Sequence, residues 1–415
     1  MHDLEPYLVV RSRAQGWYRG PANTSNMSPR IAAVLLFSAC CVVATVRGPL
    51  ADVVLSVGLM LALLWRPSPL GRLARRKIGL VATVIVLGIA STIAAHAQGR
   101  PVSAWQICRS SIWIAASVVT FVVAGERFRA VKTACRRFGM VLEAVFVLMA
   151  ASIIVELATG LPLAPAVIRY YPDDSELPRL YAAGVAASVP LAIFFMRTRR
   201  RVAFLATATV VFATQGKAVL LALALGLGLE MMGRPRSIRT VMAMLVILLV
   251  GIVVQVRVLE LLDVGDMQRA RQIVEGVDAF ESTPVSMMIG IGHGVAYSEG
   301  YGAFAEETDE NERLLDNSRY DLENGPVFLL LRFGILGTLL VAMALHPHGA
   351  STGQKLLFWL ITLVYFSASA HLASPGGPVC LLAFALLLAN DTHQRAAPAS
   401  LGSAPQAAPT AWTSG

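Results

Sequence analysis

Two stretches of the chain carry cationic residues that could hold a phosphate. In residues 214–219, which read Thr-Gln-Gly-Lys-Ala-Val, Lys217 lies in a tight connection between two apolar runs. In the second stretch, Arg269-Ala270-Arg271 opens a segment with apolar residues at helical spacing, namely Ile273, Val274, Val277 and Phe280. Arginine suits phosphate because its planar fork donates two hydrogen bonds at once. The alternatives are a lysine that extends its charge from a helix end into water and arginines that are ordinary surface charges.

A glycine-rich turn forms the third stretch. Residues 284–294 read Pro-Val-Ser-Met-Met-Ile-Gly-Ile-Gly-His-Gly, and Gly290, Gly292 and Gly294 would let backbone amides approach a ligand closely. His293 could act as an acid, a base or a donor to a diphosphate. A lone Gly-x-Gly-x-Gly is a weak signal, and a single loop histidine usually has none of these roles.

The fourth stretch precedes an apolar run. Residues 321–326 read Asp-Leu-Glu-Asn-Gly-Pro, and Pro326 after polar residues predicts the start of a helix. Glu323 could accept a proton, or could only favour the positive end of the helix dipole. Arg332 lies about two turns, roughly 10 Å, inside this helix. A buried arginine there needs a partner anion.

The elements that position these residues are membrane-spanning helices. Of the 415 residues, 56% are hydrophobic and 15% are charged, which is too apolar for a soluble domain. The apolar runs suit a hydrocarbon core of about 30 Å, which takes roughly 20 residues as helix, whereas a β-barrel would show alternating residues. The net charge of +9 lies in short clusters between these runs, so it does not indicate nucleic-acid binding. The five cysteines show neither metal-ligand spacing nor a disulfide framework.

We expect an all-α, polytopic bundle of about twelve transmembrane helices. Residues 1–30 would be a cytoplasmic tail, residues 31–260 would hold helices one to nine, and residues 325–390 would hold helices ten to twelve. A large external loop with short helices, residues 261–324, separates the two groups, and residues 391–415 would be a disordered cytoplasmic tail. The predicted segments are residues 31–46, 49–65, 78–96, 108–125, 138–158, 180–196, 202–214, 217–232, 238–260, 325–345, 355–372 and 376–390.

The loops between these segments alternate in charge, which predicts their orientation. With both termini in the cytoplasm, 23 of the 35 Lys and Arg residues fall on the cytoplasmic side, as expected for a multi-pass protein. The four stretches that could do chemistry then lie at the external surface.

Together, the four stretches resemble motifs of the bacterial O-antigen ligase and polysaccharide polymerase superfamily. Gly216-Lys217-Ala218 is similar to the Ser-Arg-Gly-like periplasmic turn of that family, and residues 269–294 resemble its arginine-led helix and glycine-rich turn. The family's His-Asn pair, followed after nine residues by Gly-x-x-Gly, is matched by Glu323-Asn324 and by Gly334-Ile335-Leu336-Gly337. The chain departs from the family by having Glu323 at the histidine position and Arg332 where a glutamate is common.

The resemblance implies transfer of a glycan from undecaprenyl diphosphate to an acceptor sugar at the periplasmic face of a bacterial inner membrane, without metal, cofactor or nucleotide sugar. Glu323 would be the catalytic base, and the substrate-binding residues would be Lys217, Arg269, Arg271, His293, Asn324 and Arg332. The implied partners are the lipid-linked donor, the glycan acceptor, the lipid bilayer, and a chain-length regulator or export proteins.

We expect a polymerase that joins repeat units of an exopolysaccharide or O-antigen. The sister alternative is an O-antigen ligase that transfers a finished glycan to the lipid A core of lipopolysaccharide. A non-catalytic transporter of lipid-linked glycan and a structural component of an export complex are the alternatives from other classes.

Overall fold

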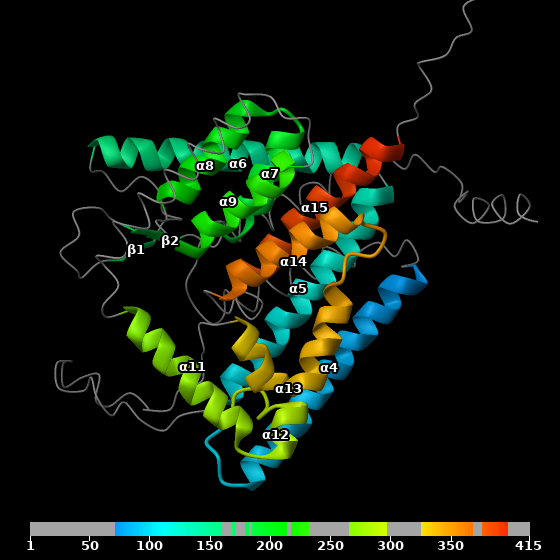
Figure 1. Cartoon of the computed structure of the whole chain (residues 1–415), viewed down its shortest axis with the longest axis vertical. Helices are drawn as coiled ribbons and strands as arrows, with labels where there is room; N and C mark the ends of the chain where they lie inside the picture. Colours follow the sequence, from blue (N-terminus) through cyan, green and yellow to red (C-terminus); the bar gives the residue numbers. More distant parts are fainter. Residues whose placement is uncertain are drawn as a thin grey trace, which may run out of the picture.

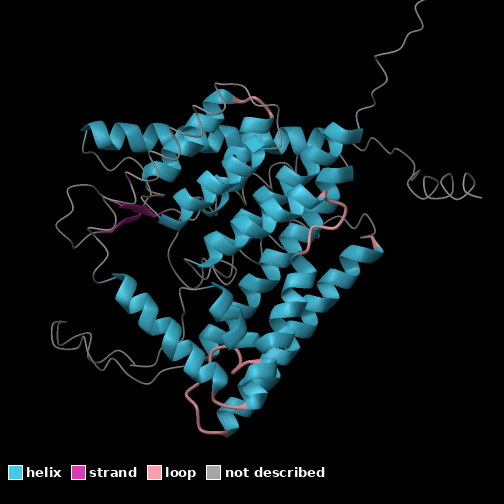
Figure 2. Cartoon of the chain, in the orientation of Figure 1, coloured by secondary structure: helices cyan, strands magenta, loops and turns pink. Residues whose placement is uncertain are grey.

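The computed structural model describes residues 71–130, 132–159, 168–170, 179–181, 185–213, 217–232, 265–296, 325–367 and 376–396. This part of the chain is almost entirely helical (Figure 1). Its only strands, β1 (Ile168–Tyr170) and β2 (Arg179–Tyr181), form a small antiparallel sheet (Figure 2). The predicted all-helical fold class is therefore confirmed in outline.

Among the residues that the structure describes, four helices are long and apolar enough to cross a membrane, which supports the predicted membrane character. They are α4 (Arg72–Ala97), α5 (Ala104–Ala130), α6 (Lys132–Thr159) and α13 (Gly325–Leu345). Shorter apolar stretches lie in α7 (Val185–Arg197), α8 (Arg201–Ala213), α9 (Lys217–Met232), α14 (Thr352–Ser367) and α15 (Gly376–Ala396). The count of twelve helices and the cytoplasmic position of both termini stay predictions.

The helix boundaries agree with the sequence in most of the described chain. The predicted segments 217–232 and 325–345 coincide with α9 and α13. The predicted start at residue 180 was wrong, because Leu180 and Tyr181 belong to β2, and hydropathy does not separate an apolar strand from a helix. Helix α15 also continues to Ala396, past the predicted end at 390, because the polar residues there contain no helix breaker. The predicted segments 31–46, 49–65 and 238–260 lie outside the described residues, as do the tail 1–30 and loop residues 297–324.

The described helices pack in two groups. In one group, α4 packs along α5 and α13, and two short helices, α11 (Gly265–Glu281) and α12 (Pro284–Ile289), pack against α13. In the other group, α7 packs against α8 and α9, α8 packs against α6, and α14 packs against α9. Helix α15 joins the groups because it packs along both α5 and α7. In Figure 1, α12 lies at the lower end of α4 and α13, and α6 crosses the top.

Large apolar side chains point outward from several of these helices. Val86 and Ile93 on α4 are 64% and 65% exposed, and Leu148 on α6 is 68% exposed. A protein in water rarely presents such surfaces, whereas lipid chains cover them without cost. The outward faces are thus consistent with a bilayer as the surrounding solvent.

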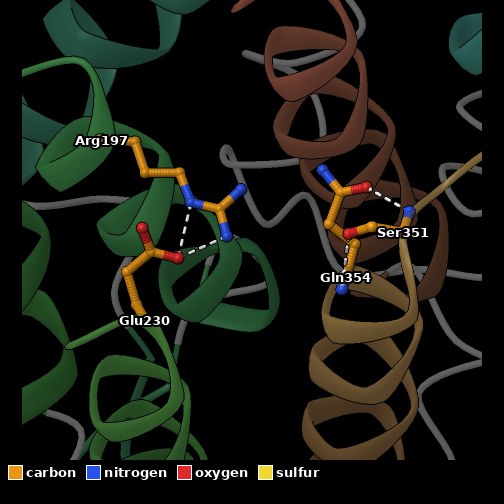
Figure 3. Close-up of polar contacts among 4 residues, drawn as sticks. All are labelled: Arg197, Glu230, Ser351 and Gln354. Carbon is orange, nitrogen blue, oxygen red and sulfur yellow. Dashed lines mark hydrogen bonds and ion pairs between the residues drawn. The ribbon is translucent and has the colours of Figure 1, made fainter. Parts of the chain in front are cut away.

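Two polar contacts fix helix ends (Figure 3). Arg197, the last residue of α7, donates from Nε to Glu230 Oε2 of α9 at 2.8 Å, and this pair is about nine-tenths buried. Ser351 directly precedes α14, where its backbone N–H donates to Gln354 Oε1 at 2.8 Å and its hydroxyl accepts from Gln354 N at 3.4 Å. This reciprocal capping box fixes the start of α14 and the turn that leads into it.

Candidate functional site

The candidate site begins at α12, whose start is closely capped. The hydroxyl of Thr283 accepts from the Ser286 N–H at 3.0 Å, the hydroxyl of Ser286 accepts from the Thr283 N–H at 3.0 Å, and Pro284 occupies the first turn. Reciprocal capping of this kind, with proline early in the helix, explains why six residues suffice for a helix here. Gly290 ends the helix with a φ of 79°. The chain then enters residues 290–296, which we call the glycine turn.

The glycine turn packs backbone against backbone. Gly290, Gly292 and Gly294 all have positive φ, at 79°, 99° and 64°. A Cβ at Gly290 would lie 2.4 Å from the Arg332 carbonyl oxygen, and a Cβ at Gly292 would lie 2.4 Å from the Thr92 nitrogen. We expected these glycines to admit a ligand. In the structure they admit the protein's own backbone instead, because α4, α5 and α13 surround the turn.

Helix α13 is broken where the glycine turn meets it. Gly334 has a φ of 64° and a ψ of −173°, which interrupts the helix between two regular halves. In an unbroken helix the Leu331 carbonyl would accept from residue 335. Here it accepts from the Ile291 N–H of the glycine turn at 2.8 Å. The turn thus satisfies a carbonyl that the break would otherwise leave unpaired.

Hydroxyl groups of α4 anchor the same region. Ser91 Oγ donates to the Ile289 carbonyl at 3.0 Å. Thr92 Oγ1 lies 2.8 Å from the carbonyl oxygens of both Gly88 and His293. Buried carbonyls are costly without donors, so these serine and threonine side chains stabilise the docked turn.

His293 is fully buried at the centre of the site. Its relative exposure is 0%, and its Nδ1 lies 2.9 Å from Ser110 Oγ. Its ring packs edge-to-face with the Phe333 ring, with 4.7 Å between the two ring centroids. Ser110 Oγ also lies 2.7 Å from the Gln106 carbonyl oxygen, and the imidazole tautomer decides whether the hydroxyl or Nδ1 is the donor between Ser110 and His293.

The opposite ring nitrogen of His293 faces α4. Within the described residues Nε2 has no hydrogen-bond partner, and a Cβ at Gly88 would lie 2.3 Å from it. Burial, together with the nearby Arg332 charge, lowers the pKa of His293 to about 3. The imidazole is therefore neutral and fills the notch that Gly88 leaves. In the structure the protein encloses this ring. The predicted role of His293 in binding substrate stays a prediction.

Arg332 lies beside His293 and is 1% exposed. Its Nη1 donates to the Gly292 carbonyl at 3.1 Å and also to the Val295 carbonyl, and its guanidinium lies 5.7 Å from the centroid of the Phe328 ring. We expected a partner anion for this buried charge. The structure shows two backbone carbonyls of the glycine turn sharing the charge at Nη1, so Arg332 holds the turn against α13.

The structure places the other predicted site residues on different elements. Arg269 and Arg271 lie in the first half of α11, which packs against α12 and α13. Lys217 is the first residue of α9, whose main neighbours are α14 and α7. Glu323 and Asn324 lie outside the described residues, immediately before Gly325 at the start of α13. Of the predicted set, the structure brings His293 and Arg332 together.

Sequence reasoning missed Ser91, Thr92 and Ser110, which hold the glycine turn. The available signal was a hydroxyl residue inside an apolar run, close to its predicted external end. Such residues usually bond to their own helix, so the sequence did not distinguish them from neighbours such as Ser152, which bonds to the carbonyl four residues earlier.

No protein-family model matches the chain, and no curated protein matches it. The resemblance to the ligase and polymerase superfamily therefore rests on the motifs of the chain itself.

Proposed function

We propose that this protein is a membrane glycosyltransferase of the polysaccharide polymerase type, which joins lipid-diphosphate-linked glycan units at the external face. The observation that supports it is the docking of residues 265–296 on α13. Helices α11 and α12 pack against α13, and Arg332 of α13 binds the glycine turn. The loop that carries Arg269 and Arg271 is thereby anchored on the helix that Glu323 and Asn324 immediately precede.

The chemistry needs few groups. An acceptor hydroxyl attacks the anomeric carbon, the bond from that carbon to the diphosphate oxygen breaks, and the diphosphate leaves with the electron pair. Glu323 takes the hydroxyl proton, and the cations of Arg269, Arg271 and Lys217 offset the charge of the leaving diphosphate. His293 and Arg332 are positioning residues in this proposal, because the Arg332 side chain is buried against the glycine turn and the His293 side chain is buried against α5 and α13.

The test is polymer formation by purified protein from a lipid-diphosphate-linked repeat unit. Glu323→Gln should lower the rate by about 100-fold or more, because a general base contributes that much. Asp278→Asn is the matched control, since Asp278 is an exposed carboxylate on α11. Replacing Lys217 with Ala should raise the donor concentration needed for half-maximal rate. Normal polymer length from Glu323→Gln would refute the role of Glu323 as base.

One observation favours a second candidate, a transporter of lipid-linked glycan. Transporters often bind substrate where a membrane helix is broken, and α13 is broken at Gly334 beside the buried cation Arg332. The same reconstituted system separates the two functions. A polymerase lengthens the glycan and releases lipid diphosphate, whereas a transporter moves the donor across the vesicle membrane with its covalent structure unchanged.

A further inference from the structure

A cavity lies at the opposite end of the same helices. It is lined by the first turns of α4, the last turns of α5, the turn 346–351 and α15. The lining includes the polar residues Lys77, Glu126, Arg129 and His348 and apolar residues such as Phe121 and Leu388. The alternation of basic clusters along the chain predicts that this end faces the cytoplasm. A pocket lined by both cationic and apolar side chains suits an amphipathic anion.

Lys77 is a buried cation on the wall of this cavity. It is 7% exposed, its Nζ donates to the His346 carbonyl at 2.6 Å, and the ammonium lies 5.7 Å from the centroid of the Phe121 ring. An ammonium carries three donors. Within the described residues no carboxylate lies within 4 Å of it. A buried charge of this kind is costly unless an anion accompanies it.

Arg129 adds a second cation to the same wall. Its Nε donates to the Gly125 carbonyl at 2.9 Å and its Nη1 donates to the His348 carbonyl at 3.1 Å. Its Nη2 makes no hydrogen bond in the described part of the chain. Glu126, the single carboxylate among the lining residues, accepts from the Gly71 N–H at 3.3 Å and pairs with neither cation. The cavity is therefore net positive.

The turn that positions these cations is itself fixed. The carbonyls of His346 and His348 bind Lys77 and Arg129, and the capping box of Ser351 and Gln354 holds the far end of the turn (Figure 3). The imidazoles of His346 and His348 pack edge-to-face at 5.0 Å. Burial, with the neighbouring lysine charges, lowers the pKa of both histidines, so both are neutral near pH 7. The positive charge of the wall thus comes from Lys77 and Arg129.

We propose that this cavity binds the phosphate group of an anionic phospholipid of the inner leaflet. Lys77 and Arg129 contact the phosphate, and an acyl chain lies along Phe121 and Leu388. Basic pockets between membrane helices on the cytoplasmic side recognise anionic headgroups in this way. The apolar lining residues favour a lipid over a soluble phosphate. The inference rests on the membrane placement and orientation, and it is independent of the glycosyltransferase proposal.

The test uses the full chain purified in neutral detergent, with lipid binding followed by native mass spectrometry and by the shift in thermal unfolding. Phosphatidylglycerol should bind and raise the melting temperature, and phosphatidylcholine should not. Arg129→Gln should weaken phosphatidylglycerol binding about tenfold. Arg76→Gln is the matched control, since Arg76 is exposed beside Lys77 but does not line the cavity, and binding should stay within about twofold.

A variant that binds the lipid more tightly distinguishes an effect on binding from a loss of folding. Glu126→Gln removes the single lining carboxylate and should tighten phosphatidylglycerol binding about threefold, which a destabilised protein does not do. Inorganic phosphate and glycerol phosphate, at the same concentrations as the lipid, should not shift unfolding. If either soluble phosphate bound as well as the lipid, the lipid assignment would be overturned. Equal loss of binding in Arg129→Gln and Arg76→Gln would overturn the site itself.

Discussion

The two ends of the α4, α5 and α13 group use the same residue types in opposite ways. At the end that holds the glycine turn, Arg332 and His293 are fully buried, and their polar atoms contact other groups of the protein, so they fix the turn in place. At the other end, Arg129 and His348 are exposed on the wall of a cavity. Burial, more than residue type, therefore decides which arginines and histidines are available to a ligand.

The largest effect should come from adding a side chain at a glycine of the glycine turn. Gly292→Ala puts a Cβ 2.4 Å from the Thr92 nitrogen at a φ of 99°, and it should destabilise the protein by at least about 3 kcal/mol. Gly99→Ala has a similar φ of 82° but open space, so strain alone should cost about 1 kcal/mol. Thermal unfolding in detergent measures both. Equal costs would show that the close packing contributes nothing.

Replacing the arginines tests the comparison between the ends directly. Arg332→Met leaves the Gly292 and Val295 carbonyls without their charged donor and should cost about 3 kcal/mol of unfolding free energy. Arg129→Met removes an exposed side chain and should change stability little in lipid-free detergent. Unfolding curves of the two variants, recorded side by side, give the difference. The distinction fails if Arg129→Met proves as damaging as Arg332→Met.

Lowering the pH should destabilise the packing around His293. The pKa of His293 is about 3 in the folded protein and 6.5 when exposed, so only the unfolded chain takes up this proton between those values. The contribution of neutral His293 to the free energy of unfolding is fully present above pH 6.5. Below that, the free energy of unfolding should fall by about 1.4 kcal/mol per pH unit as the pH drops toward 3. His293→Gln should lose this part of the slope. His96→Gln, at an exposed histidine of α4, should retain it.

The smallest effect is expected at the cap of α14, beside the cavity. Ser351→Ala removes the hydroxyl that accepts from Gln354 N and should cost about 1 kcal/mol. Thr352→Ala, one residue later on an exposed position, should be nearly neutral. Melting temperatures of the two variants check the difference, and indistinguishable values would mean that the cap is not needed to hold the turn 346–351.

The sequence predicted helices well and their interior contacts poorly. The ends of α9 and α13 followed from apolar runs bounded by polar residues. The meeting of His293 with Arg332 did not, because it requires the break at Gly334 and the docking of a loop some forty residues away in sequence. Lys77 belongs to the basic cluster of residues 72–77, and the alternation of such clusters along the chain predicts only the orientation of the helices. Hydropathy gives no information on which member of such a cluster turns inward.

The position of the glycine turn along the chain has a consequence for how the protein is assembled. Its partners come from Thr92 and Ser110, which are made early, and from Leu331 and Arg332, which are made late. A nascent chain that has reached residue 296 therefore holds the α4 and α5 groups that enclose His293, and still lacks those of α13. We infer that the glycine turn is enclosed only after residues 331–334 have been made, and that chains truncated before Gly334 leave its α13-facing side open to quality control.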